Sequence, residues 1–385
     1  MIIQIINLTS QGVFKTYSEL YNIYRNVYFP GLIGLEIRGL PSGLAGTVKK
    51  IVLSVSQICY KSRKKQADFT DLFIPGSIPD FFELSRKVLA LGNEDLGYKI
   101  INAVKNYEEY NSKSIRLGNR ELPLCSSYVM GILNVTPDSF SDGGLYLDEN
   151  DAVTHALNML ENGANIIDIG GESTRPGSTL VSAEEEIKRV IPVIEQIVKK
   201  NSNAIISVDT NKSEVAALAL KAGASIINDI SSGDFDPDMI SVVKEYNAAI
   251  VLMHMQGTPE NMQINPHYDN LIKDIYDYLH DRAQKALKAG IKNIIIDPGI
   301  GFGKTVEDNF EIIKRIDDFK SLGFPILIGV SRKGFIGKTL NLQVNNRDEA
   351  TAILESVAIS NGARFIRTHN VALGSRVTRL LNIIS

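Results

Sequence analysis

Polar and charged residues stand at the ends of a series of short apolar runs in this chain. Runs such as IIDIGG (166–171) and IISVD (205–209) are almost entirely apolar until they reach an ionisable side chain. Because the carboxyl ends of strands in a parallel barrel share one face, residues far apart in sequence are expected to meet there in one pocket. The residues at or just beyond such run ends are Asp168, Asp209, Asn228, Asp297, Ser331, Lys333, Arg367 and His369.

These residue types favour binding of an anion. Arg175, Arg367 and His369 can supply positive charge, and the forked guanidinium group suits phosphate oxygens. The loops at 136–140, 173–178 and 297–304 are rich in Gly, Pro and hydroxyl residues, so they can close over a site or present backbone N–H groups to a phosphate. His254 in VLMHMQG is expected to be a packed histidine at a strand end, and we leave it out of the catalytic set.

The elements that must position these residues alternate regularly along the chain. Counting from Tyr128, we find eight strand candidates, each followed by a helix candidate such as 182–199, whose apolar residues recur at helical spacing. This pattern predicts a (β/α)8 barrel, and the size of about 250 residues that such barrels have fits residues 112–385. A doubly wound open sheet is the alternative, since its strands are also continuously apolar. The number of repeats favours the barrel.

Composition excludes several classes of function. The net charge of -3 gives no general electrostatic reason to bind nucleic acid. Cys59 and Cys125 are too few for a disulfide framework or a cysteine-based zinc site. No apolar run reaches the roughly 20 residues of a membrane span, and the N-terminus has neither a basic flank nor a cleavage motif. We therefore expect a cytoplasmic protein with no nucleic-acid or membrane partner.

Residues 1–111 lack the regular alternation of strands and helices that follows. We therefore predict that they form a separate small α/β domain. We expect strands at 34–40 and 71–75 and helices at 42–54, 80–91 and 94–110. The basic cluster at 61–65 lacks interleaved aromatic residues and is interpreted as a solvated loop, so this domain is assigned no chemistry. Residues 114–124, with Gly118 and Asn119 at the centre, predict a hairpin that could plug the floor of the barrel.

Several conspicuous segments follow one another along the chain: MGILNVTPDSFSDGG, DIGGESTRPGS, SVDTNK, INDISSG, LMHMQGTP, DPGIGFGK and GVSRKGFIG. In this order they resemble the dihydropteroate synthase family. The resemblance covers essentially all of 125–385, and its first two motifs are highly specific together. The N-terminal segment LEIRGLPSGLAGTVKK is similar to an extension found in some longer members.

This resemblance implies a transferase that joins (7,8-dihydropterin-6-yl)methyl diphosphate to 4-aminobenzoate and releases diphosphate, in folate or methanopterin-type biosynthesis. It also implies Mg2+ bound by Asn134, with most of the metal's coordination left to water and diphosphate, and a homodimer. The implied pterin site is Asp209, Asn228, Met253, Asp297 and Lys333. The implied diphosphate and aminobenzoate site is Thr174, Arg175, Pro176, Phe302, Ser331, Arg367 and His369, with Lys333 also at the aminobenzoate. The implied catalytic set is Asp209, Arg175, Lys333, Arg367 and His369.

The last motif departs from the family pattern. Most relatives have His-Asp there, whereas this chain has Asn370 after His369. We expect the carboxylate that positions the histidine or a neighbouring arginine to be lost. The amine substrate is then 4-aminobenzoate or a bulkier ribosyl phosphate derivative, as in some archaeal relatives. The alternative functions are a pterin-dependent methyltransferase domain and a pterin-binding module without activity.

The implied mechanism depends on electrostatic stabilisation, because an arylamine is neutral at pH 7 and needs no strong base. Arg175→Ala or Asp209→Ala should each lower turnover by about two to three powers of ten, the usual cost of losing one preorganised charge or donor. Steady-state rates of product formation test this expectation, and near-normal rates for both variants would contradict the mechanism.

Overall fold

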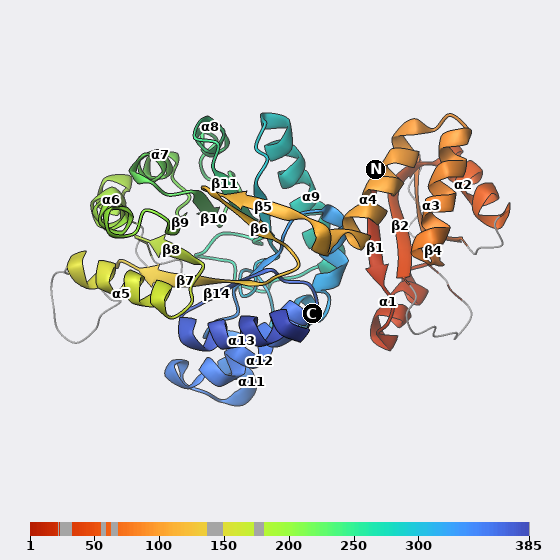
Figure 1. Ribbon diagram of the computed structural model, residues 1–385. Helices are drawn as coiled ribbons and strands as arrows, with labels where there is room; N and C mark the ends of the chain where they lie inside the picture. Colours follow the sequence, from red (N-terminus) through yellow and green to blue (C-terminus); the bar gives the residue numbers. More distant parts are fainter. Residues whose placement is uncertain are drawn as a thin grey trace. The chain divides into compact units, whose positions relative to one another are not determined.

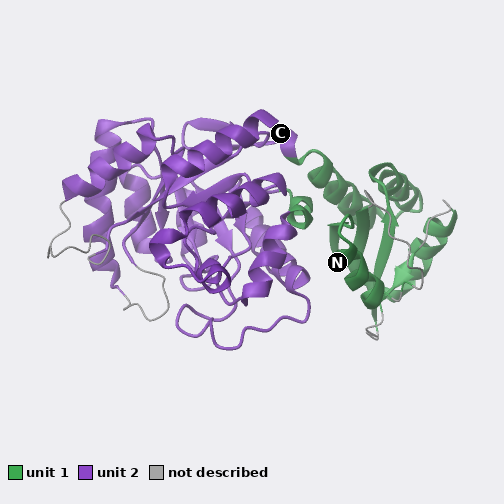
Figure 2. Ribbon diagram, turned by 90° about the horizontal axis from the view of Figure 1, so that it is seen from below, with its two compact units in different colours: residues 1–110, 317–323 green, residues 111–316, 324–385 purple. Residues whose placement is uncertain are grey.

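The computed structural model describes residues 1–21, 23, 33–54, 59–62, 68–136, 149–172 and 181–384. These residues form two compact units, which Figure 2 shows in different colours. The small unit consists of residues 1–110 and 317–323, and the large unit consists of residues 111–316 and 324–385. Within the described part of the chain, no helix combines the length and the apolar character needed to cross a bilayer.

The small unit is built on a four-stranded antiparallel sheet with the order β1-β2-β4-β3. A core formed by α2, α3 and α4 with the sheet lies apart from a second cluster, in which Val13, Tyr17 and Tyr21 of α1 pack near Phe73. The strands are β1 (Ile2–Asn7), β2 (Ile33–Pro41), β3 (Tyr60–Lys61) and β4 (Phe69–Gly76), and the helices are α1 (Gln11–Tyr21), α2 (Ser42–Ser54), α3 (Ile78–Ala90) and α4 (Glu94–Glu108).

The small α/β region and the strands and helices predicted for it are present. The sequence analysis missed β1, β3 and α1. β1 has the sequence IIQIIN, which lacks the alternation of a half-exposed strand because even Gln4 is buried.

Residues 317–323 belong to the small unit because they satisfy the outer edge of β1. The backbone N–H of Ile5 donates to Ser321 Oγ at 3.2 Å, and that of Asn7 donates to Asp318 Oδ1 at 2.7 Å. The Asn7 side chain also donates to Asp317 Oδ2 at 3.0 Å. An edge strand otherwise presents unpaired N–H groups, so this short segment, within the 3-10 helix η3 (Ile316–Leu322), completes the sheet.

The large unit contains the predicted barrel, whose strands are surrounded by helices in Figure 1. Eight parallel strands of the described residues follow the order β12-β11-β10-β9-β8-β7-β14-β13. A parallel bridge between Ile296 and Ile326 joins the two ends of this order, so the open-sheet alternative is wrong. The strands are β7 (Tyr128–Asn134), β8 (Ile166–Gly170), β9 (Ile205–Asp209), β10 (Ile226–Asp229), β11 (Ala249–Met253), β12 (Ile294–Asp297), β13 (Leu327–Ile328) and β14 (Phe365–Thr368).

The helices of the large unit alternate with these strands. The helix predicted at 182–199 is α6, which begins one residue later because Ser182 is its N-cap and accepts a hydrogen bond from the backbone of Glu185. The helices are α5 (Glu149–Glu161), α6 (Ala183–Lys200), α7 (Ser213–Ala222), α8 (Met239–Glu245), α9 (Leu271–Ala289), α10 (Val306–Lys314), α11 (Gly334–Leu340), α12 (Asp348–Ser360) and α13 (Val371–Ile384), with 3-10 turns η1 (Tyr110–Ser112) and η4 (Val344–Asn346).

The predicted hairpin, β5 (Ser114–Leu117) and β6 (Arg120–Pro123), plugs the floor of the barrel. Its buried side chains Ile115, Leu117 and Leu122 share one apolar cluster with the first residues of most of the barrel strands. Apolar side chains therefore close the amino-terminal end of the barrel. The polar residues of the predicted site lie at the opposite end. The strand residues of this cluster include Tyr128, Ile166, Ile205, Ile226, Ala249, Leu327 and Phe365.

We expect Leu117→Ala to lower the free energy of unfolding by about 2 to 5 kcal/mol, because it leaves a cavity under the barrel. Chemical denaturation of the full chain measures this loss. Arg116→Ala, at an exposed position in the same strand, is the control and should change stability by less than about 0.5 kcal/mol. Equal stability of the two variants would show that the hairpin is not part of the core.

Candidate active site

The register of the barrel strands places several predicted site residues at one level. Asn134 of β7 pairs with Gly170 of β8, and Gly170 pairs with Asp209 of β9. Asp209 in turn pairs with Asn228 of β10. Because all these residues lie at the carboxyl ends of their strands, their side chains gather at the mouth of the barrel, as the sequence predicted.

Arg367 of β14 connects two carboxylates across this mouth. Its Nε donates to Asp168 Oδ2 at 2.6 Å, and its terminal nitrogen donates to Asp209 Oδ2 at 2.7 Å. Asn228 Nδ2 donates to the same Asp168 oxygen at 3.2 Å. Four strands therefore contribute to one hydrogen-bonded cluster.

Burial and charge oppose each other in this cluster. Burial acts to lower the pKa of Arg367, but Asp168 and Asp209 outweigh it and raise the pKa, so the guanidinium stays charged. Burial raises the pKa of Asp209, and the charge of Arg367 opposes that change. Asp168 is fully buried, and its Oδ1 has no hydrogen-bond partner among the described residues. The sequence analysis placed Asp168 at a strand end but gave it no role. The pairing of Asp168 with Arg367 was therefore not predicted.

Asp297 lies at the end of β12 and faces a tight backbone turn. Its Oδ1 accepts a hydrogen bond from the backbone N–H of Gly299 at 2.7 Å. Gly299 has φ +74, and a Cβ there would lie 1.8 Å from the His254 carbonyl oxygen, so only glycine fits. Burial raises the pKa of Asp297 to about 6. Met253, buried at the end of β11, is its register neighbour.

Lys333 and Phe302 form the next part of the site. The Lys333 ammonium lies 4.3 Å from the centre of the Phe302 ring, a cation–π contact. Burial lowers the pKa of Lys333 to about 8, Arg367 adds to that effect, and Asp297 and Asp209 oppose it. The charged residues predicted for the pterin site, Lys333, Asp297 and Asp209, therefore lie near enough to influence one another.

His369 and Ser331 are also brought together. The Ser331 hydroxyl lies 2.9 Å from His369 Nδ1, and the backbone N–H of His369 donates to the same oxygen at 3.1 Å. The two residues follow neighbouring strands, β13 and β14. The imidazole is thus held by a side chain that the sequence had assigned to the same anion site.

Asn370 corrects one expectation. Its Nδ2 donates to Asp348 Oδ2 at 2.9 Å, and Asp348 accepts two hydrogen bonds from Arg332, at 2.6 and 2.8 Å. The carboxylate beside the arginine is therefore not lost but is supplied by the first turn of α12. Sequence spacing could not reveal this, because Asp348 lies outside the recognised motifs.

His254 is packed, as expected, but its partner was missed. Its Nδ1 lies 3.0 Å from Lys304 Nζ, and that amine also donates to the carbonyl oxygens of His254 and Phe302, at 3.3 and 2.9 Å. Burial lowers the pKa of Lys304 to about 7 and places that of His254 well below its usual value. Lys304 thus fastens the GIGFGK loop to the end of β11.

Three predicted residues, Thr174, Arg175 and Pro176, lie outside the described residues. The residue before this gap is Glu172, which forms an ion pair with Lys212. Lys212 Nζ also lies 2.6 Å from Glu186 of α6, so Lys212 links Glu172 to this helix.

Asn134 was expected to bind Mg2+. Within the described ranges, no group of three or more His, Cys, Asp or Glu side chains is arranged to hold a metal ion. Asn134 Oδ1 lies 3.7 Å from the position that a Cβ on Gly170 would take, and Asp209 Cβ lies 3.6 Å from that position. The glycine therefore leaves space beside both side chains, and a magnesium site with few protein ligands fits this arrangement.

Comparisons with known proteins decide the family. Residues 130–369 match the model of a family described as pterin binding enzyme. A dihydropteroate synthase of Clostridium beijerinckii is 46% identical over 276 residues, covering 71% of this chain and 97% of that protein. The chain belongs to the dihydropteroate synthase family. It is therefore a transferase, as the motifs implied.

Solved structures of this family agree with the fold. A Xanthomonas albilineans dihydropteroate synthase with 4-aminobenzoic acid is 39% identical, has a TM-score of 0.66, and covers 71% of this chain and 98% of its own. The same organism's enzyme in complex with 7,8-dihydropteroate is 37% identical with a TM-score of 0.64, at 71% and 98% coverage. The share of this chain that these structures cover is thus about the share that the barrel unit occupies.

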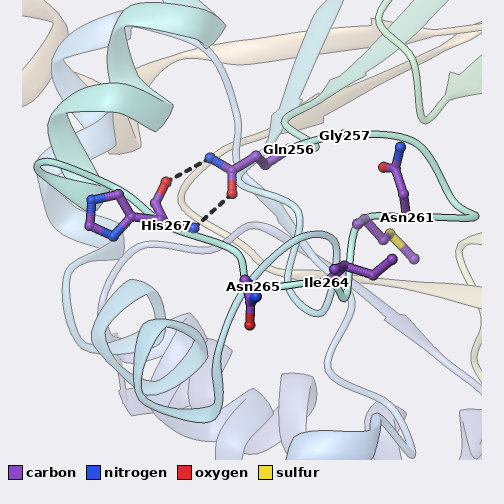
Figure 3. A pocket seen from close by; sticks show the side chains of 7 residues that line it. Gln256, Gly257, Asn261, Ile264, Asn265 and His267 are labelled. Carbon is purple, nitrogen blue, oxygen red and sulfur yellow. Dashed lines mark hydrogen bonds between the residues drawn. The ribbon is translucent and has the colours of Figure 1, made fainter.

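A separate cavity of about 420 Å³ lies in the long loop after β11. The Gln256 amide closes this loop, because it donates to the His267 carbonyl at 2.7 Å and accepts from its backbone N–H at 3.0 Å, as Figure 3 shows. None of the residues predicted for the dihydropteroate synthase site line this cavity. Its lining is Gln256, Gly257, Asn261, Met262, Ile264, Asn265 and His267.

The pKa of Asp297 generates a prediction about pH. If Asp297 binds the pterin ring, as the sequence predicts, two strong hydrogen bonds need its ionised carboxylate. The Kd for a pterin should then rise as pH falls through about 6, approaching about tenfold per pH unit. Calorimetric titration with a pterin between pH 5 and 8 measures this. Asp297→Asn should bind more weakly and lose most of the pH dependence. An affinity of the unmodified protein that is constant from pH 5 to 8 would exclude this role.

Proposed function

We propose that this chain joins (7,8-dihydropterin-6-yl)methyl diphosphate to 4-aminobenzoate, with release of diphosphate and formation of 7,8-dihydropteroate. The observation that carries the proposal is the buried cluster of Asp168, Asp209, Asn228 and Arg367 at the barrel mouth. The relatives support it, since solved family members contain 4-aminobenzoic acid or 7,8-dihydropteroate.

The pterin would bind deepest, against residues from three strands. An ionised Asp297 can accept two N–H donors from the aminopyrimidinone edge, and bidentate contacts to a charged group are the strong ones. Asn228 offers a complementary amide, with both a donor and an acceptor. Met253 would line the flat side of the ring, where a polarisable thioether makes favourable aromatic contacts.

The diphosphate would bind above the pterin, where cationic groups meet. Arg367, His369 and Ser331 belong to the described part of this region, and Arg175 is expected to join them. Arg367 already shares its charge with Asp168 and Asp209, so it serves both to hold the acids in place and to attract the anion. Phe302, Pro176 and Lys333 would form the aminobenzoate subsite, which the contact between Lys333 and Phe302 supports.

Loss of the leaving group would run ahead of attack by the amine. The C–O bond breaks with its electron pair passing to diphosphate, and a cationic methylene conjugated to the pterin remains. Asp209 would stabilise this cation electrostatically, because its carboxylate is held nearby by Arg367. The amine nitrogen then forms the C–N bond and gives up its proton after bond formation, so no strong base is needed.

Asn134 is the residue that would hold Mg2+ through its side-chain oxygen. The bound metal would neutralise charge that develops on the departing diphosphate. Gly170, the register neighbour of Asn134, adds no side chain beside this side-chain oxygen. Residues 135–146 and 173–180, most of which lie outside the described residues, are expected from the sequence alone to exclude water from the cation.

Neither alternative function is favoured by a specific observation. A pterin-dependent methyltransferase has no diphosphate to expel, and the paired Ser331 and His369 have no evident use there. A module without activity predicts loss of site residues, whereas Asp348 restores the carboxylate that Asn370 lacks.

We also propose that two copies of the chain pair as a homodimer. Ile353 and Val357 lie one turn apart on α12 and are 58% and 42% exposed. Leu340, at the end of α11, and Val344, in the following 3-10 turn, are also exposed, and α11 and α12 both contact α10. A second copy would remove this apolar surface from water, and the molecular mass in solution tests the proposal.

The proposed reaction is tested with purified protein, the pterin diphosphate, Mg2+ and labelled 4-aminobenzoate. We expect labelled dihydropteroate and one equivalent of diphosphate. A parallel reaction with an aminobenzene ribosyl phosphate separates the two amine substrates, because the preferred amine gives the higher kcat/KM. Failure to form product with either amine would refute the proposed function.

A further inference from the structure

Glu355 is a buried acid behind the proposed anion site. It lies in α12, is 1% exposed, and its Oε1 has no hydrogen-bond partner among the described residues. Its carboxyl interacts with the hydroxyl of Thr368, at the end of β14. Both side chains also lie within 4 Å of the position that a Cβ on Gly374 would take. A glutamate buried in this way needs an explanation, since buried carboxyl groups are usually paired with a cation or hydrogen-bonded.

A chain of hydroxyl groups leads from this acid to His369. Thr368 Oγ1 donates to Ser331 Oγ at 3.4 Å. Ser331 Oγ also accepts the backbone N–H of His369 at 3.1 Å and lies 2.9 Å from Nδ1 of the same residue. Glu355, Thr368, Ser331 and the imidazole are therefore connected in series.

The donor at the contact between Thr368 and Ser331 fixes the direction of this chain, because Thr368 gives its hydrogen to Ser331. A serine hydroxyl has one hydrogen to donate and two lone pairs that accept. At Ser331 both lone pairs are used, one by the Thr368 hydroxyl and the other by the His369 backbone. The only remaining atom, the hydroxyl hydrogen, must then point to Nδ1, which makes Nδ1 an acceptor.

The same argument applies one step further from the site. The Thr368 hydroxyl has given its hydrogen to Ser331, so it can only accept from Glu355. Glu355 must then be a neutral carboxylic acid that donates its hydrogen. An ionised Glu355 would instead accept from Thr368 and reverse the whole chain.

We propose that Glu355, acting through Thr368 and Ser331, is a positioning residue that fixes His369 as the tautomer with hydrogen on Nε2. The use of this hydrogen, as a donor to the diphosphate, rests on the proposed function. The tautomer itself is a property of the protein without substrate.

The surroundings of Glu355 support the neutral acid. Burial raises the pKa of Glu355 to about 8. The hydrogen bond with Thr368 opposes this change, and the charge of Asp348, in the first turn of the same helix, adds to it. Asp348 is itself paired with Arg332. From β14 and α13, the groups that face it are Thr368 and the backbone at Gly374.

Nuclear magnetic resonance of the protein labelled with 15N in histidine tests the tautomer directly. The chain has five histidines, so the ring signals are few, and His369→Gln assigns the relevant one. We expect a neutral ring with hydrogen on Nε2 in the unmodified protein at pH 7. Hydrogen on Nδ1, in a neutral or a charged ring, would overturn the proposal.

Two pairs of variants test the chain of hydroxyls. Thr368→Val has the same shape but no hydroxyl, so one lone pair of Ser331 Oγ loses its donor. This lone pair can then accept a hydrogen bond from His369, and a His369 ring with hydrogen on Nδ1 should appear. Thr368→Ser restores the hydroxyl and should restore the original tautomer. Glu355→Gln keeps a neutral donor and should preserve the tautomer, whereas Glu355→Met should give a mixture. Ser356→Ala, which removes the next hydroxyl of α12, is the control and should change nothing.

Kinetics separate this proposal from the proposed function. Thr368→Val should lower kcat/KM for the pterin diphosphate by about tenfold, with KM for 4-aminobenzoate unchanged and with recovery in Thr368→Ser. If the tautomer responds as expected but no amine gives product, the proposed function fails and the role of Glu355 stands. If product forms and the tautomer is the same in Thr368→Val and in the unmodified protein, the role of Glu355 is refuted.

Discussion

The structure at the mouth of the barrel depends on one charged group held between two acids. Arg367 donates hydrogen bonds to Asp168 and Asp209 at the same time, and Asp168 is fully buried. Burying such charges is costly unless they are paired and hydrogen-bonded, and removing one partner leaves an uncompensated charge. The eight-stranded register makes this pairing possible, because β8, β9 and β14 bring the three side chains to one place. Asn228 and Asp297 are then arranged around a cluster in which one guanidinium offsets part of the charge of two carboxylates.

The two ends of the barrel divide stability from chemistry. At the amino-terminal end, the hairpin β5–β6 and the first residues of the strands form a purely apolar cluster. At the carboxyl end, polar groups are held by hydrogen bonds to one another and to tight turns such as that at Gly299. The acids can remain close together there because the apolar floor supplies the free energy of folding that a polar site does not.

The sequence predicted the barrel because each strand is a continuous apolar run with a polar end. This pattern can be recognised in the sequence without knowing which residues contact one another. It also placed Asp209, Asn228 and Asp297 correctly at strand ends. It did not predict which side chains pair, because reach and direction are set by the assembled barrel. Lys304 against His254, and Asp348 between Arg332 and Asn370, are such cases. β1 was missed because both of its faces are buried, so it lacks an alternating pattern.

The segment 317–323 affects how the small unit could be produced by itself. A gene fragment that stops at residue 110 would encode all four strands of the small sheet but would lack the acceptors for the N–H groups of Ile5 and Asn7. Its outermost strand would be open to pairing with other molecules, and self-association of the fragment follows from that exposure. The small unit is therefore discontinuous in sequence, and no single cut in the chain can release it intact.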